Sequence, residues 1–105
     1  MEFTGNEGAP IAIGIAGDWT KRYRSKNPGA TQGQFLGRVI LERLLAEAGS
    51  KGIRFYYGLD ANNQPQLLAV AADAAQNDLL GDKCIVADET WPAPPNSGQP
   101  NQLNS

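Results

Sequence analysis

The hydrophobic positions of residues 9–26 fit two different periods. Isoleucine occupies every second position from 11 to 15, which favours a strand. Four large side chains instead recur every fourth position, as on one face of a helix: Ile11, Ile15, Trp19 and Tyr23. Pro10 suits a first helical turn, and the polar run 21–26 is too long for a strand. We therefore predict a helix that ends before Asn27, with strand and helix both left open for residues 11–17.

A second amphipathic segment begins after Thr31, whose hydroxyl suits an N-cap. Its apolar positions form a stripe at helical spacing: Phe35, Leu36, Val39, Ile40, Leu44 and Leu45. Gly49 is suited to the C-cap. The pattern predicts a helix between these caps that packs on a sheet.

The next segments alternate as strands do. Aromatic and β-branched residues over 53–57 predict a strand. The turn-rich residues 60–65 and the apolar residues 66–71 complete a hairpin. A polar turn then leads to a third predicted strand at 83–87.

These elements predict an α+β fold in which two N-terminal helices pack on a small antiparallel sheet of about three strands. We expect an extended N-terminal arm at residues 1–10, a single α+β domain at 11–91 and a Pro/Asn/Gln-rich C-terminal tail at 92–105. The tail is uncharged and carries four prolines, so we expect it to be extended or disordered in isolation.

Composition narrows the chemistry. The 105 residues include no histidine and one cysteine, Cys84. Catalytic systems that need histidine are therefore excluded, and one thiol cannot form an intramolecular disulfide or a structural zinc site. Carboxylates are plentiful, but their spacing selects no acid–base pair. We predict a non-enzymatic protein without a cofactor, a catalytic residue or a bound metal.

The net charge of −2 is unevenly distributed. Residues 19–54 sum to +6, whereas residues 1–18 sum to −3 and residues 55–105 to −5. Such polarity favours contact between copies or with an acidic partner. The first helix carries a basic patch that is a candidate for nucleic-acid contact: Lys21, Arg22, Arg24 and Lys26.

Two short motifs are weak. Residues 60–71 resemble a calcium loop, but Pro65 stands where that loop needs glycine and Ala71 where it needs glutamate, so we interpret residues 60–65 as a turn. Gly14 and Gly17 lack the pattern of a phosphate-binding loop, and we attribute them to close helix packing.

Our leading hypothesis is a self-assembling structural or interaction protein, a homo-oligomer or filament subunit that uses its terminal arms for inter-subunit contacts. The predicted contacts are Phe3, Trp91, Pro92, Pro94, Pro95 and Leu103. The alternative is a small ligand-, protein- or nucleic-acid-binding module that uses the basic helix Lys21–Lys26 or the sheet face.

No apolar run is long enough to span a membrane, and the acidic N-terminus is unlike a secretory signal. We expect a cytoplasmic protein, with export by an unusual route left open.

Several segments together resemble a family of small uncharacterised bacterial proteins. The most specific is Gly52-Ile53-Arg54-Phe55-Tyr56-Tyr57-Gly58, a Gly-Ile-Arg-x-Tyr-Tyr-Gly core. The other matching segments are Trp19-Thr20, Tyr23-Arg24, Asn27-Pro28, Phe35-Leu36-Gly37, Asn77-Asp78-Leu79 and a Pro-rich end near Leu103-Asn104-Ser105. The resemblance implies no particular activity. Relatives commonly have cysteine where this chain has Ser50, Ala93 and Ser97, so a metal or redox role would not carry over.

Overall fold

A computed structural model describes residues 1–104 of the chain, which form an α+β fold. The residues group into two compact units. Unit 1 comprises residues 1–7 and 36–90, and unit 2 comprises residues 8–35 with those from 91 onward. The divisions after residues 7 and 90 lie near the expected arm and tail boundaries at residues 10 and 91, and a further division follows residue 35. Ser105, the last residue of the predicted tail, lies outside the described residues.

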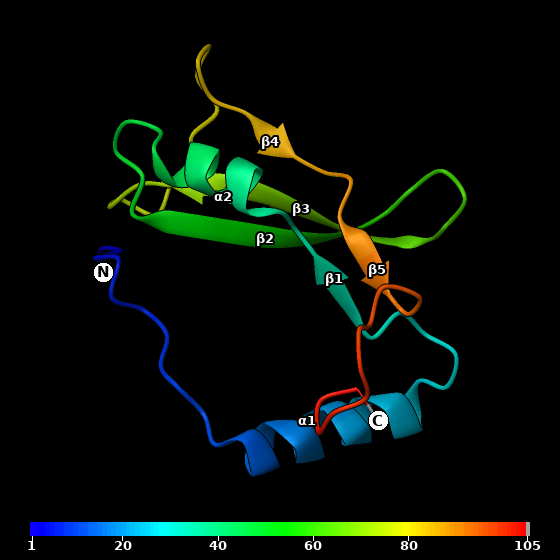
Figure 1. Cartoon of the computed structure of the whole chain (residues 1–105). Helices are drawn as coiled ribbons and strands as arrows, with labels where there is room; N and C mark the ends of the chain where they lie inside the picture. The colour runs from blue at the N-terminus through cyan, green and yellow to red at the C-terminus, as the bar shows by residue number, and fades with distance from the viewer. Residues whose placement is uncertain (105) are drawn as a thin grey trace. The chain divides into compact units, whose positions relative to one another are not determined.

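Unit 1 is built on a three-stranded antiparallel sheet (Figure 1). Strands β2 (Gly52–Leu59) and β3 (Pro65–Ala72) form the predicted hairpin and pair along their whole length, from Gly52 opposite Ala72 to Leu59 opposite Pro65. Strand β4 (Val86–Ala87) adds two residues on the other side of β3. The third strand is thus confirmed in place but is shorter than the predicted 83–87.

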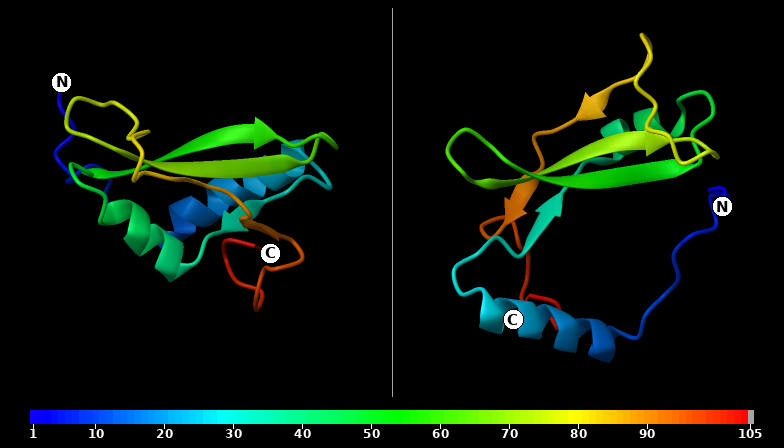
Figure 2. Two further views of the ribbon diagram at one scale, coloured as in Figure 1. Left: turned by 90° about the horizontal axis from the view of Figure 1, so that it is seen from above. Right: turned by 180° about the vertical axis from the view of Figure 1, so that it is seen from behind.

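Helix α2 (Arg38–Leu45) packs against one face of this sheet (Figure 2). Leu44 is fully buried at the centre of the core, where it clusters with three alanines of the sheet: Ala69, Ala71 and Ala87. The predicted helix beginning after Thr31 and reaching Gly49 was too long. Gly37 occupies the N-cap, and residues 33–35 form a strand instead.

Unit 2 contains helix α1 (Ile13–Lys26) and a two-stranded antiparallel sheet of β1 (Gly33–Phe35) and β5 (Trp91–Ala93). The helical interpretation of residues 13–26 is confirmed, and the helix ends before Asn27 as predicted. Helix α2 packs on the three-stranded sheet as expected, whereas α1 belongs to the other unit.

The C-terminal segment of unit 2 folds back on α1 and β1. Gln32 donates its backbone N–H to Ala93 C=O at 2.7 Å, and the Arg24 guanidinium donates to Leu103 C=O at 2.7 Å. A methyl group on Gly17 would lie 2.8 Å from the carbonyl oxygen of Gln102. The segment is therefore ordered by polar backbone contacts and by a glycine that permits close approach.

Candidate functional site

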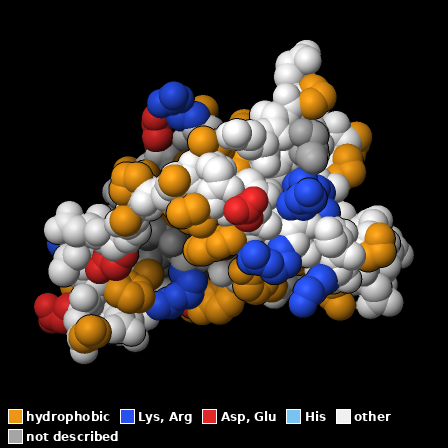
Figure 3. All heavy atoms as spheres, turned by 90° about the horizontal axis from the view of Figure 1, so that it is seen from below, with side chains coloured by type: hydrophobic (Ala, Val, Ile, Leu, Met, Phe, Trp, Pro, Cys, Tyr) orange, Lys and Arg blue, Asp and Glu red, His pale blue; other side chains and the backbone are white. Residues whose placement is uncertain are grey.

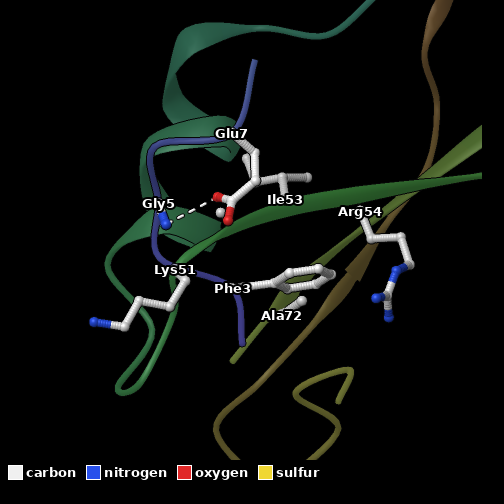
Figure 4. A pocket seen from close by; sticks show the side chains of 8 residues that line it. Phe3, Gly5, Glu7, Lys51, Ile53, Arg54 and Ala72 are labelled. Atoms are coloured by element: carbon white, nitrogen blue, oxygen red, sulfur yellow. Dashed lines mark hydrogen bonds between the residues drawn. The ribbon is translucent and has the colours of Figure 1, made fainter. Parts of the chain in front are cut away.

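The predicted contact Phe3 is engaged within unit 1 (Figure 4). Its N–H donates to Ala74 C=O at 2.8 Å, and its half-buried ring lies 5.3 Å from Cζ of Arg54, a cation–π geometry. The ring lines a cavity of about 340 Å³ together with Gly5, Glu7, Lys51, Gly52, Ile53, Arg54 and Ala72. Phe3 therefore anchors the start of the chain to its own sheet.

Glu7 closes a tight turn at the end of this N-terminal segment. Its carboxylate accepts the backbone N–H groups of Thr4 and Gly5, each at 2.9 Å. These hydrogen bonds, that from Thr4 first, stabilise the charged form and lower the pKa of Glu7. The carboxylate thus serves the local turn, and the segment is not simply extended.

Four of the predicted contacts, Trp91, Pro92, Pro94 and Pro95, lie on β5 and just after it. Trp91 lies opposite Phe35 in the β1–β5 pair, and both rings are more than 60% exposed. Pro92 is half-buried, whereas Pro94 and Pro95 are exposed. The structure therefore brings Trp91 together with Phe35, an aromatic pair that sequence reasoning missed because it had placed Phe35 in a helix.

Leu103 lies in a different environment, against α1. It lines a hollow of about 180 Å³ with Trp19, Thr20, Tyr23, Arg24 and Gln32. Leu103 remains 42% exposed, and the two aromatic residues beside it are exposed as well, Trp19 at 60% and Tyr23 at 48%. The hollow is too small for a drug-sized ligand, which needs roughly 300–1,000 Å³.

The basic patch does not form a single charged row. Lys21, Arg22 and Lys26 are exposed, but Arg24 is half-buried and bonded to Leu103 C=O. Since successive helical residues are about 100° apart, the four cations spread over roughly 200° of the helix. A row that follows phosphates would need them on one face, so this geometry disfavours a nucleic-acid interface.

Three polar side chains meet on β2 and the loop before β4. Asp78 accepts the Tyr56 hydroxyl at 2.6 Å and the Arg54 guanidinium at 2.5 Å. The Tyr56 hydrogen bond and then Arg54 lower the pKa of Asp78, and Asp78 in turn raises the pKa of Arg54. A carboxylate held charged in this way is a poor proton donor or acceptor near neutral pH. The cluster ties the loop to the sheet.

Asp60 is committed to its own turn. Its carboxylate accepts the N–H groups of Asn62 and Gln64 and the side-chain amide of Gln66 at 2.9–3.0 Å. These bonds, led by that from Gln64, lower the pKa of Asp60. The turn interpretation of residues 60–65 is therefore confirmed.

Within residues 1–104, no group of three or more His, Cys, Asp or Glu side chains is arranged to hold a metal ion.

The molecule leaves an unusual amount of apolar surface uncovered. Only six hydrophobic residues of the described chain are buried, and four of them are alanines: Leu44, Ala69, Val70, Ala71, Ala72 and Ala87. Seventeen large hydrophobic residues of the same range are exposed. On the face drawn in Figure 3, hydrophobic side chains lie interleaved with Lys and Arg. This exposed surface is the strongest functional feature that we find.

Sequence reasoning missed an exposed apolar stretch of unit 1 that lies on β2. Tyr57 is 92% exposed, Leu59 is 68% exposed and Phe55 is 47% exposed. The alternation of residues 53–57 had shown which side chains share a face, but not that much of that face would lie uncovered. Strand β2 is also an edge strand, so the backbone groups along one side of it have no partner strand in the sheet.

No protein-family model, no curated protein and no solved structure matches the chain. The resemblance to small bacterial proteins therefore stays a prediction. Neither described helix has the length and apolar character needed to cross a bilayer.

Proposed function

We propose that the protein is a non-enzymatic structural or interaction subunit that associates with further copies of itself. The observation that carries this proposal is the imbalance between exposed and buried apolar side chains. The exposed residues include neighbours along one strand, Phe55, Tyr56, Tyr57 and Leu59 of β2, and exposed apolar groups that cluster in this way mark interaction sites. The candidate catalytic chemistry points the same way, since the perturbed carboxylates Glu7, Asp60 and Asp78 are each occupied by local hydrogen bonds.

The small hydrophobic core of a single copy gives an energetic reason for association. Burial of apolar surface stabilises a fold by roughly 25 cal/mol per Å². Leu44 and Val70 are the only large side chains of residues 1–104 that are buried almost completely, so one copy gains little from this term. Small domains commonly supplement such a core by oligomerisation. Association would move rings such as Tyr57 and Trp91 out of water.

Charge supports contact between like copies. The +6 balance of residues 19–54 and the −5 balance of residues 55–105 allow oppositely charged segments of two copies to attract. Trp91 and the tail residues Pro94 and Pro95 are exposed and so remain available as the predicted contacts. Phe3 and Leu103 are partly used within their own units, which makes them weaker candidates.

The test is sedimentation velocity of the full chain over a hundredfold range of concentration, at low and high salt. We expect the weight-average sedimentation coefficient to rise with concentration, because mass action increases the fraction of associated protein. The rise should persist at high salt, since salt does not screen apolar contacts. Trp91→Ser should shift the rise to higher concentration, whereas the matched exposed-site control Val39→Ser should not. A single monomeric species at every concentration would contradict the proposal.

A further inference from the structure

Strand β2 has one edge with no partner. It pairs with β3 over Gly52–Leu59, and β3 is its only neighbour in the sheet. Within residues 1–104, no backbone hydrogen bond joins the other edge of residues 53–59 to any segment. Eight residues make a long edge for so small a sheet, and an unpaired edge of this kind is a template for another strand.

The register determines which residues face that edge. Leu79 donates its N–H to Ala71 C=O at 2.9 Å, so the backbone of Ala71 points away from β2. Ala71 lies opposite Ile53, and in an antiparallel pair such a position is non-hydrogen-bonded. Because the pattern alternates, Ile53, Phe55 and Tyr57 direct their N–H and C=O groups to the free edge.

The edge lacks the features that normally keep strands apart. Charged residues, proline and bulges protect most natural edge strands. Here residues 55–59 are Phe-Tyr-Tyr-Gly-Leu, without a charge or a proline. The one charge on β2, Arg54, is held by Asp78 and by the ring of Phe3. The N-terminal segment lies beside the start of β2, where Phe3, Gly5 and Glu7 line a cavity with Gly52, Ile53 and Arg54 (Figure 4).

We propose that this edge binds β2 of a second copy in antiparallel orientation, which would join two three-stranded sheets into one of six strands. The inference rests on the proposed self-association and identifies β2 as one surface that contributes to it, besides the contacts around Trp91. Residues that face the edge can pair only with each other, so an odd-numbered residue must lie opposite an odd-numbered residue. The register centred on Tyr56 does this and places Phe55 of each copy opposite Tyr57 of the other.

In this register no like charges face each other across the two β2 strands, and the contact area suggests a dimer of modest affinity. Arg54 lies opposite Gly58, so no like charges meet. A buried aromatic side chain covers about 150–250 Å², and the exposed parts of Phe55, Tyr56 and Tyr57 on two copies come to several hundred Å². This area is below the roughly 1,200 Å² of a standard interface, so we expect a weak, concentration-dependent dimer.

Single-cysteine cross-linking tests the register. In a Cys84→Ser background, Tyr56→Cys puts one thiol at the two-fold axis, where a non-hydrogen-bonded pair has Cα atoms about 4.5 Å apart, within disulfide range. Val39→Cys is the control, on an 82% exposed residue of α2. We expect disulfide-linked dimer to form about tenfold faster with Tyr56→Cys. Equal rates for the two variants would overturn the proposal.

A second variant covers the case in which Tyr56→Cys disturbs the fold. Tyr57→Lys places a charge on the free edge at a 92% exposed site, and it should weaken the dimer about tenfold with an unchanged circular dichroism spectrum. If the wild-type protein associates but Tyr57→Lys associates equally well, the β2 interface is wrong while the proposed function stands. If the wild-type protein is monomeric throughout, both are wrong.

Discussion

The two units use the same kinds of residue to different effect. Unit 1 buries Leu44 and a set of small side chains between α2 and its sheet. Unit 2 contains isoleucines, both tryptophans and a tyrosine, yet none of its described hydrophobic residues is buried and α1 has no buried residue. Hydrophobic content alone therefore does not make a core. Unit 1 has a core of its own, whereas unit 2 depends on backbone contacts between its helix, its short sheet and the C-terminal segment.

The largest expected effect comes from removing the centre of the unit 1 core. Leu44→Ala deletes a fully buried side chain, and such changes cost about 2–5 kcal/mol. We expect the amides of β3 to exchange much faster with solvent, while those of β1 and β5 keep their protection. Hydrogen exchange measured by NMR distinguishes the strands.

Val39→Ala is the control for this experiment, because Val39 lies on the same helix and is 82% exposed. It should leave exchange nearly unchanged. Equal loss of protection in β3 and in β5 after Leu44→Ala would show that the two units unfold together, and the contrast between them would fail.

The next largest effect is expected in unit 2, from the substitution Gly17→Ala in α1. Alanine favours a helix over glycine by about 1 kcal/mol, so Gly17→Ala would stabilise α1 if space allowed. The new methyl group would lie 2.8 Å from Gln102 C=O, a backbone atom that cannot easily shift. We expect the C-terminal segment to leave α1 and residues 97–104 to become sensitive to limited proteolysis.

Gly14→Ala is the matched control on the same helix, because a methyl group there meets nothing within 4 Å. It should raise helix stability without changing proteolysis of the C-terminal segment. Identical proteolysis of the two variants would indicate that the approach of Gln102 to Gly17 does not hold that segment.

The smallest effect is a pH dependence confined to unit 1. The pKa of Asp78 is lowered by Tyr56 and Arg54, so its contribution to stability is present above the ordinary aspartate pKa of about 3.9 and is lost as pH falls through the lower folded-state value. Asp78→Asn should lower the melting temperature at pH 7 and make little difference near pH 2. A difference of equal size at both pH values would contradict the assignment.

The elements that could be predicted from the sequence are those determined by local pattern. The hairpin of β2 and β3 followed from alternation and a turn-rich loop, and α1 followed from apolar residues spaced by four. The β1–β5 pair could not be predicted in this way, because Phe35 and Trp91 are far apart in sequence and each strand has only three residues. Phe35 fitted a helical stripe equally well, so a long-range pairing decided its conformation.

The candidate surface shows a different limit. The sequence identified Trp91 and the prolines as apolar residues in a polar tail, but it could not tell that Phe3 would be held by Ala74 and Arg54. Nor could it show that Phe55 and Tyr57 would stay exposed. Periodicity assigns side chains to a face, whereas exposure depends on whether enough chain remains to cover that face.

The position of the two tryptophans has a practical optical consequence. Trp19 and Trp91 both belong to unit 2 and are 60% and 62% exposed, so the intrinsic indole emission of the protein comes only from that unit. Fluorescence would then follow changes around α1 and β5, whereas far-ultraviolet dichroism follows the helices and strands of both units. Non-coincident transitions in these two signals would separate the melting of one unit from that of the other without any added label.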